Sequence, residues 1–220
     1  TLNIVDARWS EYHDHFNIVS AINNERNWED YYYNSDRATK IRELLENSSP
    51  KSLLDLGANQ GYYSFLAAKL GYSVQALDYD HGAIDKLYQY LTNTNFKYKI
   101  KPAIVNFKDI TDTKSERFRS DTTLALGFLH HMRLVELLSW EDIARKLSDL
   151  TEKKLITEFK ASTGARKYFV QEGTKHFVND YNLEDFLDSL RVHFRKVETC
   201  GSFSQFKTHS GMREIVVCEK

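Results

Sequence analysis

The sequence predicts an α/β protein whose seven strands form a doubly wound, mostly parallel sheet with an antiparallel C-terminal hairpin. Short apolar runs alternate along the chain with stretches of helical periodicity, which is typical of a parallel sheet with crossover helices. The last two runs, 196–203 and 214–219, are joined by the ten-residue link SQFKTHSGMR. Because this link is too short for a helical crossover, we expect these two strands to be antiparallel.

Residues 51–80 carry the most informative pattern: a strand, a glycine turn, a helix and a second strand. The segment 51–56 is short and apolar, which is typical of a strand buried on both faces. Gly57 and Gly61 bracket the turn, at points where a Cβ would obstruct the backbone or a ligand lying against it. The second strand ends at Asp78, and an acid about twenty residues past such a turn holds the hydroxyls of a ribose.

The turn reads G-x-x-x-G, with Asp55 two positions before the first glycine. A dinucleotide site favours G-x-G-x-x-G, and an acid near the loop would repel a pyrophosphate. The same acid could accept a hydrogen bond from the ammonium group of an amino acid. We therefore predict a ligand made of a nucleoside that carries an amino acid; the alternative is a βαβ unit without a cofactor.

This pattern resembles the class I S-adenosylmethionine-dependent methyltransferases, whose first motif is commonly D-x-G-x-x-x-G and whose second strand ends in a ribose-binding acid. The resemblance implies a Rossmann-like sheet and S-adenosylmethionine as the cofactor. It also implies that a residue just past the third strand, predicted at 96–107, recognises the adenine. The predicted cofactor-binding residues are Asp55, Gly57, Ala58, Asn59, Gly61, Asp78, Tyr79, Asn106, Phe107 and Asp109.

Not all of these assignments are unique. The spacing does not decide between Asn106 and Asp109 as the group that recognises the adenine, and Asp109 could simply begin a turn.

The predicted fourth strand, 121–128, is followed by His130 and His131. Ligands of open α/β sheets lie beyond the carboxyl ends of the strands, so we expect these histidines at the active-site mouth. An imidazole can take a proton from an attacking hydroxyl near pH 7, although packing is the alternative role. Glu158, near the end of the strand 153–159, could orient a histidine, bind substrate or simply pair with a Lys or Arg. His130, His131 and Glu158 are the predicted catalytic residues.

A narrower resemblance concerns three segments: LDLGANQGYYSFLAAKLGYSVQALD, LALGFLHH and ITEF. Together they resemble the methyltransferase domains of bacterial polysaccharide assembly, including bifunctional methyltransferase-kinases that cap O-antigen chains. This resemblance implies a glycan or small-molecule acceptor that presents a sugar hydroxyl or a sugar-linked phosphate. Two alternatives stay open: an RNA-modifying methyltransferase, and a catalytically silent cofactor-binding scaffold within a larger assembly.

Length and composition set limits on these functions. The 220 residues suit one methyltransferase domain, 36–220, with an insertion at about 161–180 and an aromatic-rich N-terminal cover or lid, 1–35. A net charge of −1 indicates no general attraction to nucleic acid. No apolar run approaches the roughly 18 residues of a membrane span, so we expect a cytoplasmic protein. Its two cysteines, Cys200 and Cys218, are expected to be reduced and buried.

Two further patterns carry weaker predictions. His13 and His15 flank Asp14, but this spacing in uncertain structure is a weak metal signal, and no metal site is predicted. Three bases of the insertion could meet an anionic acceptor, although a solvated basic face is the simpler interpretation; they are Arg166, Lys167 and Lys175. The chain begins with Thr1, so it could be part of a longer multidomain protein.

Overall fold

The computed structural model describes residues 36–48, 51–92, 94, 96–97, 99–111, 115–161, 181–204 and 212–220. The predicted cover 1–35 lies outside these ranges, together with its histidines. The predicted insertion also lies outside them, apart from Ala161, so its three bases are not described.

Seven strands of the described residues form one mixed sheet, which confirms the predicted fold class. They are β1 (Ser52–Leu56), β2 (Ser73–Asp78), β3 (Ile100–Ile104), β4 (Ser120–Ala125), β5 (Thr151–Lys160), β6 (Lys196–Ser204) and β7 (Met212–Glu219). Their order is β3-β2-β1-β4-β5-β7-β6. β2 pairs in parallel with both β1 and β3, and β4 pairs in parallel with β5. β7 is antiparallel to both β5 and β6, as the short link predicts.

The described helices follow the predicted alternation with the strands. They are α3 (Asp36–Glu46), α4 (Tyr62–Lys69), α5 (His81–Thr92), α7 (Leu129–Leu134), α8 (Trp140–Leu150) and α10 (Leu183–His193), with a short 3-10 turn η1 (Phe107–Asp109). None of these described helices is long and apolar enough to cross a bilayer.

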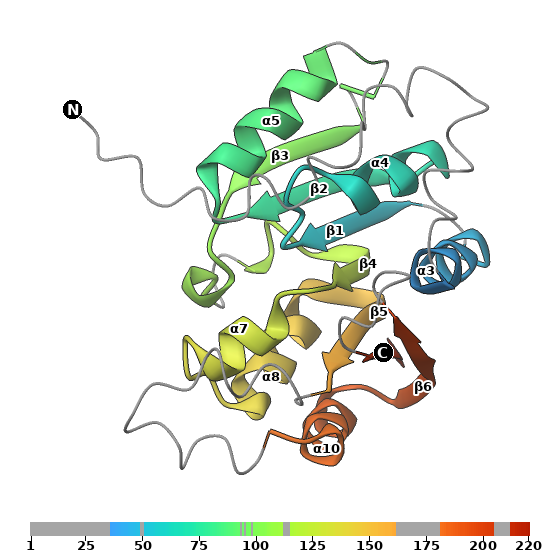
Figure 1. Ribbon diagram of the computed structural model, residues 1–220, viewed down its shortest axis with the longest axis vertical. Helices are drawn as coiled ribbons and strands as arrows, with labels where there is room; N and C mark the ends of the chain where they lie inside the picture. Colours follow the sequence, from blue (N-terminus) through green and yellow to red (C-terminus); the bar gives the residue numbers. More distant parts are fainter. Residues whose placement is uncertain are drawn as a thin grey trace. The chain divides into compact units, whose positions relative to one another are not determined.

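Contacts divide the chain into two compact units, and the first contains residues 38–110. Here α4 packs on β1, β2 and β3, while α5 packs on β2 and β3 (Figure 1). Leu53 and Val74 pair across β1 and β2, and both are fully buried. Phe65 of α4 and Leu87 of α5 are also fully buried. Full burial stabilises each such side chain by roughly 1.5–3 kcal/mol, so this apolar layer fixes where β1 and β2 end.

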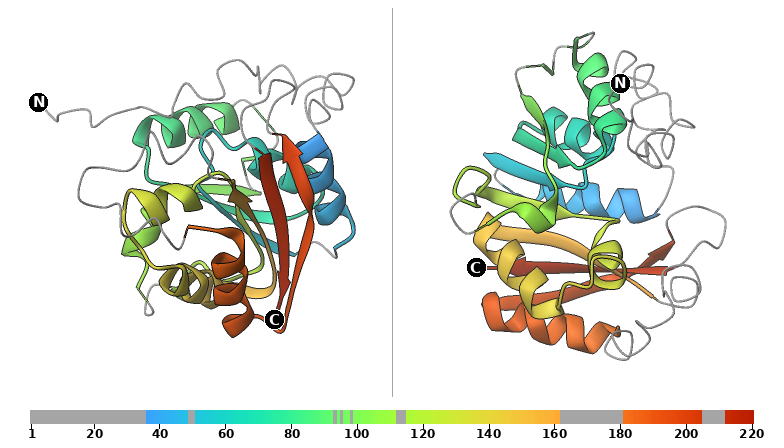
Figure 2. Two further views of the ribbon diagram at one scale, coloured as in Figure 1. Left: turned by 60° about the horizontal axis from the view of Figure 1, so that its bottom comes forward. Right: turned by 90° about the vertical axis from the view of Figure 1, so that its left-hand side faces the viewer.

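The second unit contains residues 35–37 and 111–220. Its β6 and β7 form a long antiparallel pair, coloured orange-red and dark red in Figure 2. α8 packs on β4 and β5, and α10 packs on α8 and β6. Four large rings, those of Trp140, Phe159, Tyr181 and Phe186, form a buried cluster on one face of β5. The side chains that alternate with Phe159 along β5 therefore point to the opposite face of the sheet.

Side-chain caps begin two helices of the second unit. The Ser139 hydroxyl accepts the backbone N–H of Asp142 at 3.0 Å, at the start of α8. The Asn182 side chain accepts the N–H of Asp185 at 2.9 Å, at the start of α10. Each cap satisfies an N–H that has no partner within its helix.

Three local expectations are corrected. The third strand is Ile100–Ile104, shorter than 96–107, because Asn106 accepts the N–H of Lys108 and turns the chain. The fourth strand ends at Ala125 rather than at 128: Gly127 has a φ of 85°, which ends the extended conformation, and α7 follows. Cys200 is only half-buried, whereas Cys218 is buried as expected.

Candidate active site

The glycine turn follows β1 and adopts left-handed backbone at three positions. Gly57, Asn59 and Gly61 have φ values of 71°, 49° and 87°. Glycine adopts this region without a Cβ clash, and asparagine is among the side chains that tolerate it. The N–H groups of Gly57 and Ala58 both donate to the Leu77 carbonyl, at 2.9 and 3.0 Å. The turn is therefore tied directly to the end of β2.

Asp78 ends β2 and holds the same turn through its side chain. Its Oδ2 accepts the N–H of Asn59 at 2.8 Å, and its Oδ1 accepts the N–H of Asp80 at 2.9 Å. Burial raises the pKa of Asp78, although these backbone donors act to lower it. A carboxylate can accept about four hydrogen bonds, so Asp78 can bind hydroxyl donors of a ligand in addition to these groups.

Asp55 is buried near the end of β1, with an exposed fraction of 3%. The Ser64 hydroxyl on α4 donates to its Oδ2 at 2.6 Å. Burial raises the pKa of Asp55 to about 7, the Ser64 hydrogen bond lowers it, and the charge of Asp78 raises it further. Asp55 therefore changes protonation state near neutral pH, and a cationic ligand group would favour its ionised form.

The remaining predicted cofactor residues follow β2 and β3. Tyr79 comes directly after Asp78, and 49% of its surface is exposed. Asn106 caps η1, with Phe107 buried and Asp109 exposed in the same turn. The Val105 N–H donates to the Asp78 carbonyl at 2.8 Å, which places this turn beside the end of β2. Exposed Tyr79 presents an aromatic ring that a flat ligand could stack on.

His130 and His131 lie in the first turn of α7, in the second unit. Their ring centroids are 4.1 Å apart, with planes inclined at 44°. His130 is buried, whereas His131 is partly exposed. Burial, followed by the charges of Lys160 and Arg213, lowers the pKa of His131 to about 4, and burial also lowers that of His130. Both imidazoles are therefore neutral at pH 7.

Glu158 forms a buried ion triad with two arginines, which we call the Arg–Glu–Arg triad: Arg37, Glu158 and Arg213. Arg37 Nε donates to Glu158 Oε2 at 2.7 Å, and Arg213 Nη1 donates to Oε1 at 2.5 Å. Burial would raise the pKa of Glu158, but the two guanidinium charges outweigh burial and lower it. Of the roles considered for Glu158, pairing with arginine is the one seen in these contacts.

The predicted residues thus form separate groups, each within its own unit. The first unit gathers the glycine turn, Asp55 and Asp78, and the second holds the two histidines and Glu158. Sequence reasoning missed Ser64, although its position in the first turn after the glycine motif is a usable signal. It also missed Arg37 and Arg213, whose sequence positions carry no sign of a shared partner.

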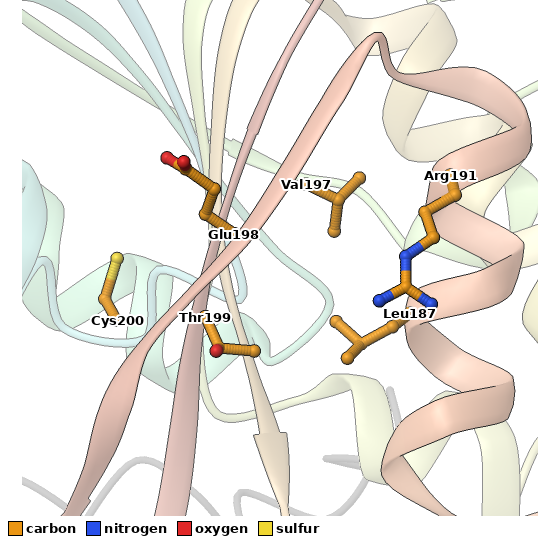
Figure 3. A pocket seen from close by; sticks show the side chains of 6 residues that line it. All are labelled: Leu187, Arg191, Val197, Glu198, Thr199 and Cys200. Carbon is orange, nitrogen blue, oxygen red and sulfur yellow. The ribbon is translucent and has the colours of Figure 1, made fainter.

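A pocket lies between α10 and β6, and it contains none of the predicted site residues (Figure 3). Its lining residues are Leu187, Arg191, Val197, Glu198, Thr199 and Cys200. Its cation, Arg191, is already paired with Glu184 at 2.8 Å and with Asp188 at 2.6 Å. These contacts do not indicate an anion-binding site.

The fold, and the glycine turn that Asp78 holds, are those of a class I S-adenosylmethionine-dependent methyltransferase, with S-adenosylmethionine as the cofactor. The model of one family, "Tellurite resistance protein TehB", matches residues 21–148, more than half of the chain. The chain belongs to this family.

Among curated proteins, the nodulation protein NoeA of Rhizobium meliloti (strain 1021) is 24% identical over 174 residues, which cover 74% of this chain and 36% of NoeA. The bifunctional kinase-methyltransferase WbdD shares the fold with a TM-score of 0.63 and 15% identity, over 90% of this chain and 42% of the WbdD chain. The chain therefore spans well under half of these two proteins.

The N-terminal domain of EvdMO1, solved with SAH bound, is a second structural neighbour. Its TM-score is 0.56 and its identity 16%, and the match covers 84% of this chain and 79% of that domain chain. The same EvdMO1 domain has also been solved in the presence of SAH and D-fucose.

Replacing Gly61 by alanine should destabilise the protein more than the same change at Gly127. Both glycines have similar φ values, 87° and 85°, so both alanines are strained by roughly 1–2 kcal/mol. Only at Gly61 would the new Cβ lie 2.5 Å from Leu87 Cδ1, whereas nothing lies within 4 Å at Gly127. We expect an additional loss of about 1 kcal/mol or more for Gly61→Ala in urea unfolding. Equal losses would contradict this packing account.

Replacing Glu158 by glutamine should strongly destabilise the protein. The amide keeps hydrogen-bonding atoms but removes the negative charge that pairs with two buried guanidinium groups, which costs about 3–5 kcal/mol. Glu46→Gln is the control, because the Glu46 pair with Arg42 at 2.6 Å is partly exposed and should change stability by less than about 1 kcal/mol. Denaturant unfolding at pH 7 measures both changes. Similar effects of the two substitutions would show that the triad is not a buried charge network.

Proposed function

We propose that the protein is an O-methyltransferase acting on a glycan or small-molecule acceptor, at a sugar hydroxyl or a sugar-linked phosphate. The part of this proposal that concerns the cofactor is supported by one hydrogen bond: the Asp78 carboxylate accepts the N–H of Asn59 at 2.8 Å. The acceptor class is supported by the resemblance to polysaccharide methyltransferase domains and by the EvdMO1 structure obtained with D-fucose. We further propose residues 36–220 as the methyltransferase domain and 1–35 as its cover.

The residues of the first unit fit the two ends of S-adenosylmethionine. Asp78 has acceptor capacity for the ribose hydroxyls, and exposed Tyr79 could cover the adenine, with Asn106, Phe107 and Asp109 in the neighbouring turn. Asp55, Gly57, Ala58, Asn59 and Gly61 would shape the amino-acid end of the pocket. When bound, the cofactor supplies an activated methyl group, so this chain mainly has to align the acceptor and give its proton a route.

Of the two histidines, His131 is the better candidate for the group that accepts the proton of the acceptor. It is partly exposed and neutral at pH 7, so one ring nitrogen can accept a hydrogen bond or a proton from a hydroxyl. His130 is buried, and its ring lies against that of His131, which suits a positioning role. A phosphate acceptor is already ionised and would require no base.

Substituting the two histidines separately tests the assignment. With a hydroxyl acceptor, His131→Ala should lower kcat by about 10²-fold or more, because the acceptor proton loses its base. SAH affinity, measured by calorimetry, should not change, and His130→Ala should have the smaller effect on kcat. Unchanged methyl transfer in both variants would remove the proposed base, and cofactor binding without transfer to any acceptor would favour a silent scaffold.

The affinity for SAH should increase as the pH rises from 5.5 to 7. The pKa of Asp55 is about 7 in the free protein, so at low pH the carboxyl carries a proton and lacks the negative charge that attracts the ammonium of the ligand. We expect binding on the order of tenfold tighter at pH 7 by calorimetry. In Asp55→Asn this dependence should be smaller, since the amide does not titrate. An identical pH slope in both proteins would contradict the role of Asp55.

A further inference from the structure

The pairing of β5 with β7 places two cations directly opposite each other. Lys160 and Arg213 are register partners in this antiparallel pair, so their side chains leave the sheet on the same face. Glu158, two residues before Lys160, lies on that face as well. Like charges directly opposite on neighbouring strands are destabilising. A position that breaks this rule invites a functional explanation.

Glu158 does not neutralise all the charge on this face. Its carboxylate oxygens accept from Arg37 and from Arg213 in the Arg–Glu–Arg triad, and among the described residues neither oxygen lies within 4.0 Å of the Lys160 ammonium. Lys160 is half-buried at the end of β5, and among the described residues its ammonium forms no ion pair within 4.0 Å. Burial and the charge of Arg213 lower the pKa of Lys160, and Glu158 opposes this shift. The Glu158 carboxylate thus pairs with Arg37 and Arg213, and it acts on Lys160 only through its charge.

Lys160 has a fixed backbone and a side chain outside the aromatic core. The Tyr181 hydroxyl donates to the Lys160 carbonyl at 2.9 Å. The neighbouring Phe159 points to the other face of the sheet and packs against Trp140 and Phe186. The backbone of Lys160 is therefore held at the carboxyl end of a parallel strand, where α/β sheets bind ligands, and its side chain does not serve the core on the other face.

The charge of Lys160 also affects the pKa values of the two histidines. Together with Arg213 it opposes protonation of His131 and His130, so the imidazoles do not add to the positive charge at neutral pH. A neutral imidazole and an unneutralised ammonium in one unit are complementary to an acceptor that carries a negative group.

We propose that Lys160 binds an anionic group, a phosphate or a carboxylate, on the methyl acceptor, and that the Arg–Glu–Arg triad positions this end of β5. This inference rests on the proposed function, because it assigns the charge of the acceptor. It names a specificity residue that the glycine and histidine motifs do not include.

Direct binding of two small anions tests the proposal without requiring methyl transfer. The full chain, labelled with ¹⁵N and saturated with SAH, is titrated with methyl phosphate and, separately, with acetate. We expect saturable shifts of the Lys160 and Ala161 amide signals with at least one of them, and the stronger binder identifies the anion class. In Lys160→Met the apparent Kd for that anion should rise by about tenfold or more, whereas Lys160→Arg should retain most of the affinity. No saturable binding of either anion to the wild type would overturn the proposal.

A matched control is Lys153, on the same strand, whose ammonium pairs with Asp121. Lys153→Met should leave the apparent Kd unchanged, and an equal loss in both variants would show only non-specific attraction and overturn the proposal. Thermal unfolding separates binding from folding: Lys160→Met should be as stable as the wild type or more stable, because an opposed charge is removed. A clear loss of stability, or wild-type affinity in this variant, would overturn the inference. Failure to methylate any acceptor while methyl phosphate still binds through Lys160 would instead count against the proposed function.

Discussion

The first unit depends on one carboxylate, that of Asp78. Three residues of the glycine turn adopt left-handed backbone, a conformation that the chain does not hold without compensating contacts. The Asp78 side chain and the Leu77 carbonyl supply them by accepting the N–H groups of Asn59, Gly57 and Ala58. The group proposed to bind ribose is therefore also the group that shapes the turn. Cofactor recognition and local folding are the same set of interactions here.

The pKa values of three buried carboxylates shift in opposite directions in the two units because their partners differ. Burial acts to raise the pKa of Asp55, Asp78 and Glu158 alike. Hydroxyl and backbone donors offset this only in part, so the pKa values of Asp55 and Asp78 stay raised. For Glu158, two guanidinium groups outweigh the effect of burial, so its pKa is lowered. The first unit thus holds carboxylates that can respond to a cationic ligand, and the second holds one committed to its arginines.

Features that depend on a few consecutive residues could be predicted from the sequence. Two examples are the glycine turn and the acid at the end of β2. The partners of Glu158 could not be predicted, because Arg37 and Arg213 lie 121 and 55 residues away along the chain. The register of β5 with β7 also places Lys160 opposite Arg213. The short α7 was missed because six residues carry too little periodicity to be distinguished from a loop.

The position of β7 has a consequence for synthesis on the ribosome. β7 follows β6 in the chain, yet it lies between β5 and β6 in the sheet. A nascent chain that has emerged only as far as β6 therefore presents an open edge on β5, and Glu158 has not yet met Arg213. Unpaired strand edges invite association with other chains. The β5 edge is therefore open to such association until β7 has been added to the sheet.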